Sequence, residues 1–529
     1  RSTGAMMTEP TSRAVPAEAD QSRSAAARGT AVRGVLVGAR IMSGLVTVGV
    51  MVAAVGGAAL VPLPTLGGAV RSALIEPEAV DTTRVCAGPV LRLGADDGTD
   101  ATRANSIGEA DLRFAASGGS PVRGSLDSTD SMTGVTPYRV DLPPASDEQL
   151  ILAASQSQSI ASGGLIGFAA TECSTASSDS WIVAGSTETG RTTLLTLSNP
   201  ASVQSIVSLE LYTEGGRVSA TGLDGIVVPV GGQRIVSIAG WAPDAESIVV
   251  RVRSSGGAIV AHLQQSVTRV LTPGGVDIAA PGVAPALRAV IPGFVVDSHT
   301  AIEDIGLGGD FHDLASIVRL LAPGDADAQA TLTVRPTPGT VKPVIEEGEE
   351  RVPETIVVPI ELKAGIVTDL PFDQLLDGSY TITIDSTVPV VAAARSSTVS
   401  SGEGVRLDSQ EGPNAGASGA IDFAWFTTAP PLATTALVSV APGPGAMLHL
   451  VNTSVNPARV TVHASTGASP VEEVSAGGSL AVPMTAGGSY MLTGFETLHV
   501  SVSYAGDGEL AGFAVTGPLP LAAAVRVYH

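Results

Sequence analysis

The chain has 529 residues, of which 44% are hydrophobic and 3% aromatic, and its formal net charge is −22. This length exceeds what one hydrophobic core supports, so we expect several domains. The acidic excess repels phosphate groups and excludes nucleic acid as a partner, and the scarcity of aromatic rings disfavours a lectin with several stacking sites.

The N-terminal region contains a long apolar segment. Residues Ile41–Val61 include no charged, Asn, Gln or His side chain. A helix of this length covers about 31 Å, close to the ~30 Å hydrocarbon core of a bilayer. The arginines that precede it outnumber the acidic residues, which keeps the N-terminus in the cytoplasm.

We therefore predict a cytoplasmic disordered tail at 1–40 and a transmembrane signal anchor at 41–63. The protein is then a single-pass protein of the cell membrane whose C-terminal domains are extracytoplasmic. A cleaved signal peptide is the alternative, although its apolar region is usually about 7–15 residues long.

Residues 80–175 follow the anchor and contain both cysteines, Cys86 and Cys173. Two cysteines in an exported chain predict one disulfide, and the absence of a CxxC pair disfavours zinc. The acidic turn Asp96–Asp100 has oxygen ligands at calcium-like spacing but lacks the later Glu of an EF-hand. We expect an atypical membrane-proximal β domain here.

After residue 175 the pattern is typical of β-strands. Val207–Tyr212 and Thr381–Ile384 alternate apolar and polar side chains, as half-buried strands do. Gly-Gly, Pro-Gly and Asp-Gly pairs separate such segments and indicate turns. The predicted fold class is all-β.

Three segments repeat one pattern of strand, short turn and alternating strand: Leu194–Leu211, Ile317–Val334 and Met447–His463. A spacing near 125 residues exceeds the ~20–50 residues of a propeller blade and suits a β-sandwich with a linker. We expect tandem immunoglobulin-like β-sandwich repeats at 176–272, 290–400 and 421–529, with a Gly/Ser-rich linker at 401–420. A single β-propeller is the alternative.

The first repeat also carries turn and core residues in a distinctive order: Trp181, Gly185-Ser186-Thr187, Leu195–Pro200, Val228–Gly231 with Arg234, and Gly257–Ala261. This order resembles an actinobacterial family of uncharacterised, membrane-anchored envelope proteins with tandem β-sandwich repeats, classed as a domain of unknown function. The resemblance spans Trp181–Gln264 and is weaker in the later repeats. It implies a fold and a location and assigns no catalytic residue.

The densest polar cluster lies in the connector that precedes and enters the second repeat. Asp297, His299, Asp310 and His312 are candidate metal ligands, because imidazole and carboxylate groups suit zinc or manganese. A solvated acidic connector is the alternative. The sequence has no nucleophile elbow, HExxH helix, P-loop or dinucleotide fingerprint, so we predict no catalytic residue and no cofactor.

Two other features have alternative interpretations. The acidic block Glu346–Glu350 indicates either a solvated loop or a surface for a basic partner. Trp181, Trp241 and Trp425 either pack in cores or form sugar platforms; two of them precede the first strand of a repeat, which favours core packing.

The leading functional hypothesis is a non-catalytic, membrane-anchored scaffold or interaction protein of the cell envelope that supports envelope glycan assembly. Its expected partners are the membrane, through the N-terminal helix, and an envelope protein or glycan. The alternatives are a glycan-processing hydrolase with its site in the connectors between repeats, and a glycan-binding module that uses Trp241 or Trp425.

Overall fold

The structure is a computed structural model of the 529-residue chain. It describes residues 46–52, 72–75, 81–94, 103–128, 130, 136–144, 150–269, 272–305, 309–341, 343–346, 349–351, 353–372, 374–400, 420–517 and 525–528. The chain forms two compact units, one of Arg1–Pro77 with Ala523–His529 and one of Glu78–Ala522.

In the smaller unit, residues 46–52 are helical, and β1 (Ser72–Ile75) pairs antiparallel with β37 (Val525–Tyr528). Among the described residues, no helix is both long and apolar enough to cross a membrane. Most of the predicted anchor at 41–63 and the whole predicted tail at 1–40 lie outside the described residues.

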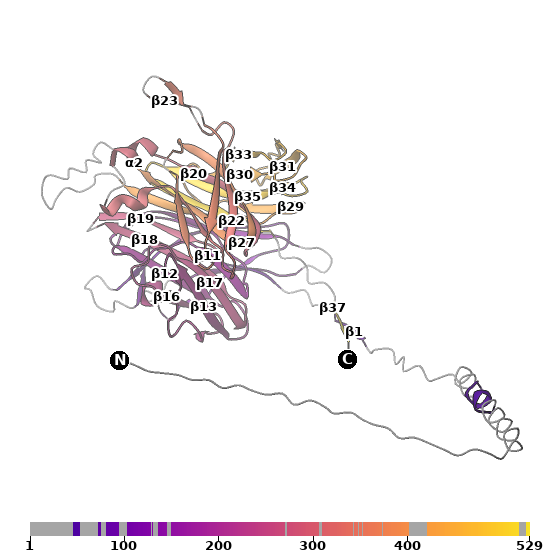
Figure 1. Cartoon of the computed structure of the whole chain (residues 1–529). Coiled ribbons are helices and arrows are strands. Elements are labelled where there is room, and N and C mark those ends of the chain that lie inside the picture. Colours follow the sequence, from indigo (N-terminus) through magenta and orange to yellow (C-terminus); the bar gives the residue numbers. More distant parts are fainter. Residues whose placement is uncertain are drawn as a thin grey trace, which may run out of the picture. The chain divides into compact units, whose positions relative to one another are not determined.

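The larger unit consists almost entirely of strands, which confirms the predicted all-β class (Figure 1). Its described helices are short: α2 (His299–Ile305) and the 3-10 helices η1 (Ile238–Gly240) and η2 (Gly309–Leu314). We divide its strands, in chain order, into four strand groups.

Strand group 1 contains both cysteines. Its sheets have the orders β10-β9-β5, β2-β8-β6 and β3-β4, and β7 pairs with β16 of the next group. The strands are β2 (Thr82–Val85), β3 (Leu91–Leu93), β4 (Ala104–Ser106), β5 (Asp111–Ala116), β6 (Val122–Ser125), β7 (Asp127–Ser128), β8 (Tyr138–Leu142), β9 (Leu152–Ser162) and β10 (Leu165–Glu172).

Strand group 2 forms two sheets, with the orders β11-β17-β13-β14 and β19-β18-β12-β16; β15 also pairs with β13. The strands are β11 (Asp179–Val183), β12 (Arg191–Ser198), β13 (Ser205–Thr213), β14 (Gly216–Arg217), β15 (Ile226–Val228), β16 (Gly232–Ser237), β17 (Val249–Gly256), β18 (Val260–Arg269) and β19 (Thr272–Ala279).

Strand group 3 is built on one 22-residue strand, β27. Its first half pairs with β20 and β22, and its second half pairs with β21 and β28. The strands are β20 (Ala286–Val296), β21 (Ile317–Leu321), β22 (Ala328–Pro336), β23 (Val344–Glu346), β24 (Glu349–Arg351), β25 (Ile356–Leu362), β26 (Thr368–Pro371), β27 (Gly378–Val399) and β28 (Ile421–Thr427).

Strand group 4 forms two four-stranded sheets, with the orders β29-β34-β31-β32 and β33-β30-β35-β36. The strands are β29 (Thr435–Ser439), β30 (Met447–Val451), β31 (Ala458–Ala464), β32 (Val471–Val474), β33 (Ser479–Pro483), β34 (Ser489–Thr493), β35 (His499–Gly506) and β36 (Glu509–Ala514).

One strand order recurs in groups 2, 3 and 4. One sheet of group 2 has the order β11-β17-β13, and the matching sheet of group 4 has the order β29-β34-β31. In both sheets the fifth long strand of the group lies between the first and the third. The others form a second sheet, as in β19-β18-β12-β16 and β36-β35-β30-β33. Group 3 has the same order, but β27 serves as a member of both sheets.

The segment 401–419 differs from its prediction as a linker between repeats. It lies outside the described residues, but the strands on either side of it, β27 and β28, pair antiparallel in one sheet. The backbone N–H of Ser400 also donates to the carbonyl of Ala420 at 2.9 Å. The segment therefore joins two neighbouring strands of group 3, and β28 belongs to that group.

The apolar cores come from alternating strand positions. In group 4, Val460 and Leu492 of one sheet and Leu450 and Val500 of the other belong to the same buried cluster. The cluster of group 2 extends beyond its own strands, because Leu321, Val391 and Trp425 of group 3 pack with it. Neighbouring groups thus share core side chains.

Candidate functional site: the interior between four edge strands

The last strand of each group lies at the edge of its sheet, and these edges meet inside the larger unit. Among the described strands, β10, β19, β28 and β36 each pair with a single neighbour. β10 and β28 pack against both β19 and β36. All seven residues of β28 are buried, and this apolar run, Ile-Asp-Phe-Ala-Trp-Phe-Thr, is typical of a strand covered on both faces.

Asp422 of β28 connects the other three edge strands. Its Oδ2 accepts hydrogen bonds from the backbone N–H of Phe168 on β10 at 2.8 Å and of Leu510 on β36 at 3.1 Å. Its Oδ1 accepts one from the N–H of Val276 on β19 at 3.1 Å. Edge strands present unpaired N–H groups, and here one carboxylate satisfies three of them.

Burial has a strong effect on this carboxyl group, which is 0% exposed. Loss of hydration raises the pKa of Asp422 well above its usual value, and the backbone N–H groups oppose that rise. The group is therefore held by backbone dipoles rather than by a cation. Such an arrangement fixes geometry and offers no exposed acid for a substrate.

Two glycines allow the neighbouring strands to approach Asp422. Gly167 has φ +138° and Gly275 has φ +113°, which are unfavourable for other residues. A Cβ atom would lie 2.5 Å from Asp422 Oδ1 at Gly167 and 2.9 Å from it at Gly275. Any side chain at these positions would push the strands apart.

A second buried acid, Asp277 of β19, contacts β28 further along that strand, at Trp425. Its Oδ2 accepts a hydrogen bond from the backbone N–H of Trp425 at 2.7 Å, and the indole N–H of Trp425 donates to Gln265 at 2.7 Å. Burial raises the pKa of Asp277 to about 7, although the backbone N–H groups of Trp425 and Ile278 lower it.

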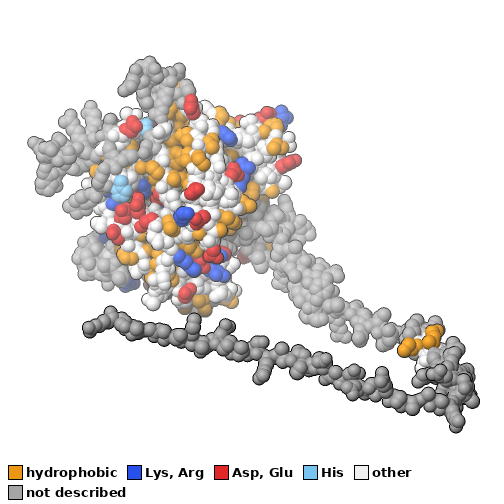
Figure 2. All heavy atoms as spheres, in the orientation of Figure 1, with side chains coloured by type: hydrophobic (Ala, Val, Ile, Leu, Met, Phe, Trp, Pro, Cys, Tyr) orange, Lys and Arg blue, Asp and Glu red, His pale blue; other side chains and the backbone are white. Residues whose placement is uncertain are grey.

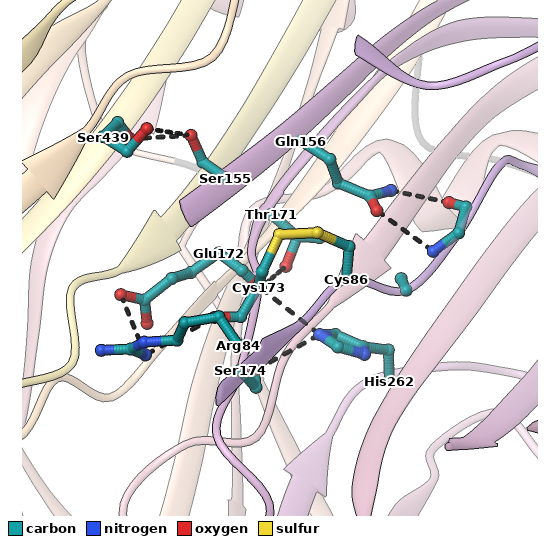
Figure 3. The surroundings of a disulfide bond; sticks show 12 residues. Arg84, Cys86, Ser155, Gln156, Thr171, Glu172, Cys173, Ser174, His262 and Ser439 are labelled. Carbon is teal, nitrogen blue, oxygen red and sulfur yellow. Dashed lines mark hydrogen bonds and ion pairs between the residues drawn. A yellow bond between two sulfur atoms is a disulfide. The ribbon is translucent and has the colours of Figure 1, made fainter. Parts of the chain in front are cut away.

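The first and last groups meet beside the disulfide (Figure 3). Arg84 of β2 lies 3.6 Å from Glu172 of β10 and donates to the hydroxyl of Thr516 at 2.7 Å. That hydroxyl in turn donates to Glu172 at 2.6 Å. Burial raises the pKa of Glu172, and Arg84 and Thr516 act against the rise.

Cys86 and Cys173 form the predicted disulfide, two residues from Arg84 and one from Glu172. Both cysteines are fully buried. Figure 3 also shows His262, whose Nε2 lies 3.3 Å from the Ser174 hydroxyl on the other side of the bridge. The disulfide thus links the ends of β2 and β10, the two strands whose side chains Arg84 and Glu172 contact Thr516.

Buried arginines join groups 2 and 3. Asp313 lies 2.7 Å from Arg269 and 3.3 Å from Arg191, and Arg319 makes a two-point contact with Asp369 at 2.8 and 2.7 Å. Burial acts to raise the pKa of Asp313, but Arg395, Arg269 and Arg191 outweigh it and lower the pKa. These charges are paired within the protein.

Comparison with known families adds one match. Residues 129–485 match DUF5719, a family of unknown function. The match covers about two thirds of the chain, well over half. The chain belongs to this family. No curated protein matches the sequence.

The DUF5719 match includes β10, β19 and β28, and therefore Asp422, Asp277 and Glu172. It excludes Cys86 and the final edge strand β36. The side chains that organise the interior are inside the family region, whereas the contacts that close it with Arg84 and Thr516 come from beyond its two ends.

Three of the four predicted metal ligands have described side chains, and each of these lies beside a different residue. Asp297 accepts from the Thr398 hydroxyl at 2.6 Å, His299 Nε2 lies 3.4 Å from Glu303, and His312 Nε2 lies 3.3 Å from Glu188. The side chain of Asp310 is outside the described residues. Where side chains are described, no group of three or more His, Cys, Asp or Glu residues is arranged to hold a metal ion.

Two of the three tryptophans, Trp181 and Trp425, pack in the core, which is the location that the sequence favoured. Trp181 is 4% and Trp425 is 1% exposed, and Trp425 lies under the guanidinium groups of Arg319 and Arg395 at 4.6 and 5.7 Å. Burial removes Trp425 as a sugar platform. Trp241 is partly buried, and its indole N–H donates to Thr221.

The two acidic blocks lie largely outside the described residues. Asp96–Asp100 lies outside the described residues. Glu346 and Glu349 are opposite each other in the β23–β24 hairpin. On the face shown in Figure 2, acidic and basic side chains are interspersed over the larger unit.

One polar cleft of about 630 Å³ lies on group 2 and is lined by Glu210, Arg217 and Arg253 among others. Glu210 lies 3.5 Å from Arg217 and 3.8 Å from Arg253. The two guanidinium groups in this cleft therefore already have an anionic neighbour.

Sequence reasoning missed the interior. A signal was present, because Asp277 and Asp422 each interrupt an apolar run in a closing strand and Glu172 is the last residue of another. The run indicates burial, and a buried acid requires partners. Their partners include backbone N–H groups of strands that are distant in the sequence. No side-chain motif identifies such backbone groups.

Proposed function

We propose that this DUF5719 protein is a non-catalytic scaffold or interaction protein of the cell envelope. It is anchored by residues 41–63 and projects groups 2–4, as tandem β-sandwiches, outside the membrane. The observation that carries this proposal is the use of Asp422. This strongly buried acid, with its raised pKa, binds the backbone of three strand groups and holds them in one body.

Enzymes place acids with perturbed pKa values in clefts that substrate reaches. In this protein Asp422, Asp277 and Glu172 are at most 4% exposed, and protein groups donate hydrogen bonds to both oxygens of Asp422 and Glu172 and to Oδ2 of Asp277. Rigid assembly is the property that such bonds favour. A body of this kind presents surfaces at fixed positions, as a scaffold requires.

The location rests on two observations. The 21-residue apolar segment follows a region rich in arginine, and the Cys86–Cys173 disulfide is typical of an oxidising compartment.

Protease protection tests this location. Protease added to intact spheroplasts should degrade residues 72–529 and spare an epitope tag at the N-terminus. A protected body with a cleaved N-terminal tag would overturn the proposed topology.

Crosslinking in intact cells tests the scaffold role. A photoreactive amino acid placed at exposed Val455 or Val203 should yield discrete adducts with envelope protein or glycan. A matched probe at buried Val460 should yield none. Equal labelling at all three positions, or adducts only with ribosomal and cytoplasmic proteins, would contradict the proposal.

A further inference from the structure

A second cleft, of about 500 Å³, lies between strand groups 3 and 4. Its floor is the outer face of the sheet formed by β20, β27 and β22. Its wall is made of two turns of group 4, around Asn452–Thr453 and Ala476–Ser479. Figure 1 labels β20, β22 and β27 next to β30 and β33, the strands whose ends carry these turns.

The floor is a ladder of polar side chains. Thr381, Thr383 and Asp385 alternate along β27 and therefore point to one face. On the neighbouring strand β22, Thr333 is opposite Thr383 and Arg335 is opposite Thr381. Arg288 of β20 lies opposite Asp385. The cleft thus offers three hydroxyl groups and two guanidinium groups on one rigid sheet.

Thr381 is the residue in this cleft that most needs an explanation. It is only 3% exposed, yet among the described residues its hydroxyl has no hydrogen-bond partner. Buried polar groups are nearly always hydrogen-bonded, and an unpaired one costs free energy. Thr381 lines the cleft, and its buried hydroxyl would gain a partner from a ligand bound at the floor.

The cleft also has excess positive charge in a protein of net charge −22. Arg288 lies 3.6 Å from Asp385, and both side chains are more than half exposed. Within the described part of the chain, Arg335 donates only to the carbonyl of Gly477, at 2.7 Å. Two guanidinium groups therefore face one carboxylate, whereas the two guanidinium groups of the cleft on group 2 face two, Glu210 and Asp224.

The wall of the cleft is held in place without a ligand. The Arg335–Gly477 hydrogen bond joins floor and wall, and the Ser479 hydroxyl lies 3.5 Å from that of Thr337. The Asn452 side chain donates to the carbonyls of Asn456 at 2.7 Å and Val474 at 3.2 Å, which fixes its turn. A preformed site loses less entropy on binding.

We propose that this cleft binds a short segment of an anionic saccharide. Hydroxyl and amide groups on a rigid surface match the many hydroxyls of a sugar, and guanidinium groups match a carboxylate on the sugar ring. Thr381 donates to the saccharide at the bottom of the cleft, and Arg288 and Arg335 contact its carboxylate. This binding proposal extends the proposed function by specifying a class of glycan. It rests on that function only for the location of the cleft outside the membrane.

Binding is measured by calorimetry on the purified full chain, in a detergent without a sugar headgroup. The probes are trigalacturonate as the anionic saccharide, maltotriose as the neutral one, and inorganic phosphate as the bare anion. Trigalacturonate should bind, with at least about tenfold preference over each of the other two probes. No binding, or equal binding of maltotriose or of phosphate, would overturn the proposal.

Three variants locate the site. Thr381→Val should weaken trigalacturonate about fivefold while leaving the thermal midpoint unchanged or raised, because the hydroxyl has no protein partner to lose. Arg288→Gln should weaken it at least about tenfold. Arg459→Gln, an exposed arginine of group 4 outside the cleft, should bind like the unmodified chain.

Trigalacturonate binding that is the same in Thr381→Val and Arg288→Gln as in Arg459→Gln would place the ligand elsewhere and refute the site. This result is independent of cell topology, so failure here leaves the proposed location and scaffold role open to their own tests.

Discussion

Asp422 and Thr381 are both almost fully buried, but their hydrogen bonding differs completely. The Asp422 carboxylate accepts backbone N–H groups from three different strand groups, whereas the Thr381 hydroxyl has no partner. Both side chains lie on closely packed strands of group 3. The difference separates a polar group that is used by the fold from one that the fold leaves available.

This distinction applies to the surface as well. In the cleft on group 2, the two carboxylates Glu210 and Asp224 balance two guanidinium groups, whereas the cleft beside Thr381 has two guanidinium groups for one carboxylate. Burial alone therefore does not identify a binding site. The decisive property is whether the protein itself satisfies the buried or charged group.

Removal of the Asp422 carboxylate should give the largest effect. In Asp422→Asn the new amide nitrogen cannot accept a hydrogen bond, so backbone N–H groups of the edge strands remain buried and unpaired. We expect a loss of about 5 kcal/mol in the free energy of unfolding, measured by urea denaturation. Asp325→Asn, at an exposed turn of group 3, is the matched control. If both variants unfold at the same urea concentration, Asp422 does not hold the groups together.

Loss of the disulfide should have the next largest effect, because it removes a covalent link in the region where groups 1 and 4 meet. The bridge closes a loop between residues 87 positions apart, and its loss in Cys86→Ser with Cys173→Ser should cost about 4 kcal/mol. Dithiothreitol should lower the thermal midpoint of the unmodified chain to that of the variant and leave the variant unchanged. A variant that melts with the oxidised chain would contradict this expectation.

His449 is intermediate between Asp422 and Thr381, since Nε2 lies 2.7 Å from the Ser503 hydroxyl and Nδ1 has no partner. Burial lowers its pKa from 6.5 to about 4. The unfolded chain then binds more protons between these values, so stability falls as the pH drops from about 6.5 to 4, by about 3 kcal/mol for this residue.

His449→Gln should reduce that acid sensitivity, as measured by urea midpoints from pH 4 to 8. Asp277 acts in the opposite direction, because its pKa is raised to about 7 and its contribution is lost as the pH rises from about 4 to 7. Asp277→Asn should therefore steepen the acid loss. Identical pH profiles for all three chains would show that neither group titrates as described.

A turn in group 2 should give the smallest effect. The Asn199 side chain donates to the carbonyls of Val203 at 2.9 Å and Val228 at 3.2 Å and accepts from the N–H of Ala201. Group 3 has Ala322 at this place. Asn199→Ala should cost about 1–2 kcal/mol in a thermal or urea midpoint analysis. A cost as large as that of Asp422→Asn would show that surface turns, rather than the interior, determine stability.

Local patterns were sufficient to predict the all-β class, the disulfide and much of the core. Alternation over Val207–Tyr212 predicted a half-buried strand whose Val207, Leu209 and Leu211 are indeed buried, and an exported chain with two cysteines left one pairing. The 401–420 segment was misinterpreted because Gly and Ser composition is the same in a linker and in a connection between paired strands. The meeting of four edge strands is non-local, and only the acids within their apolar runs hinted at it.

The place of β36 has a consequence for biogenesis. The N–H of Leu510 and the hydroxyl of Thr516 belong to the last residues of the unit to be synthesised, yet they bind Asp422 and Glu172, which were made earlier. The interior therefore stays incomplete until the whole unit has emerged. Until then the parts of β10 and β28 that β36 covers stay exposed on the nascent chain, a state in which chaperones would have to prevent association with other chains.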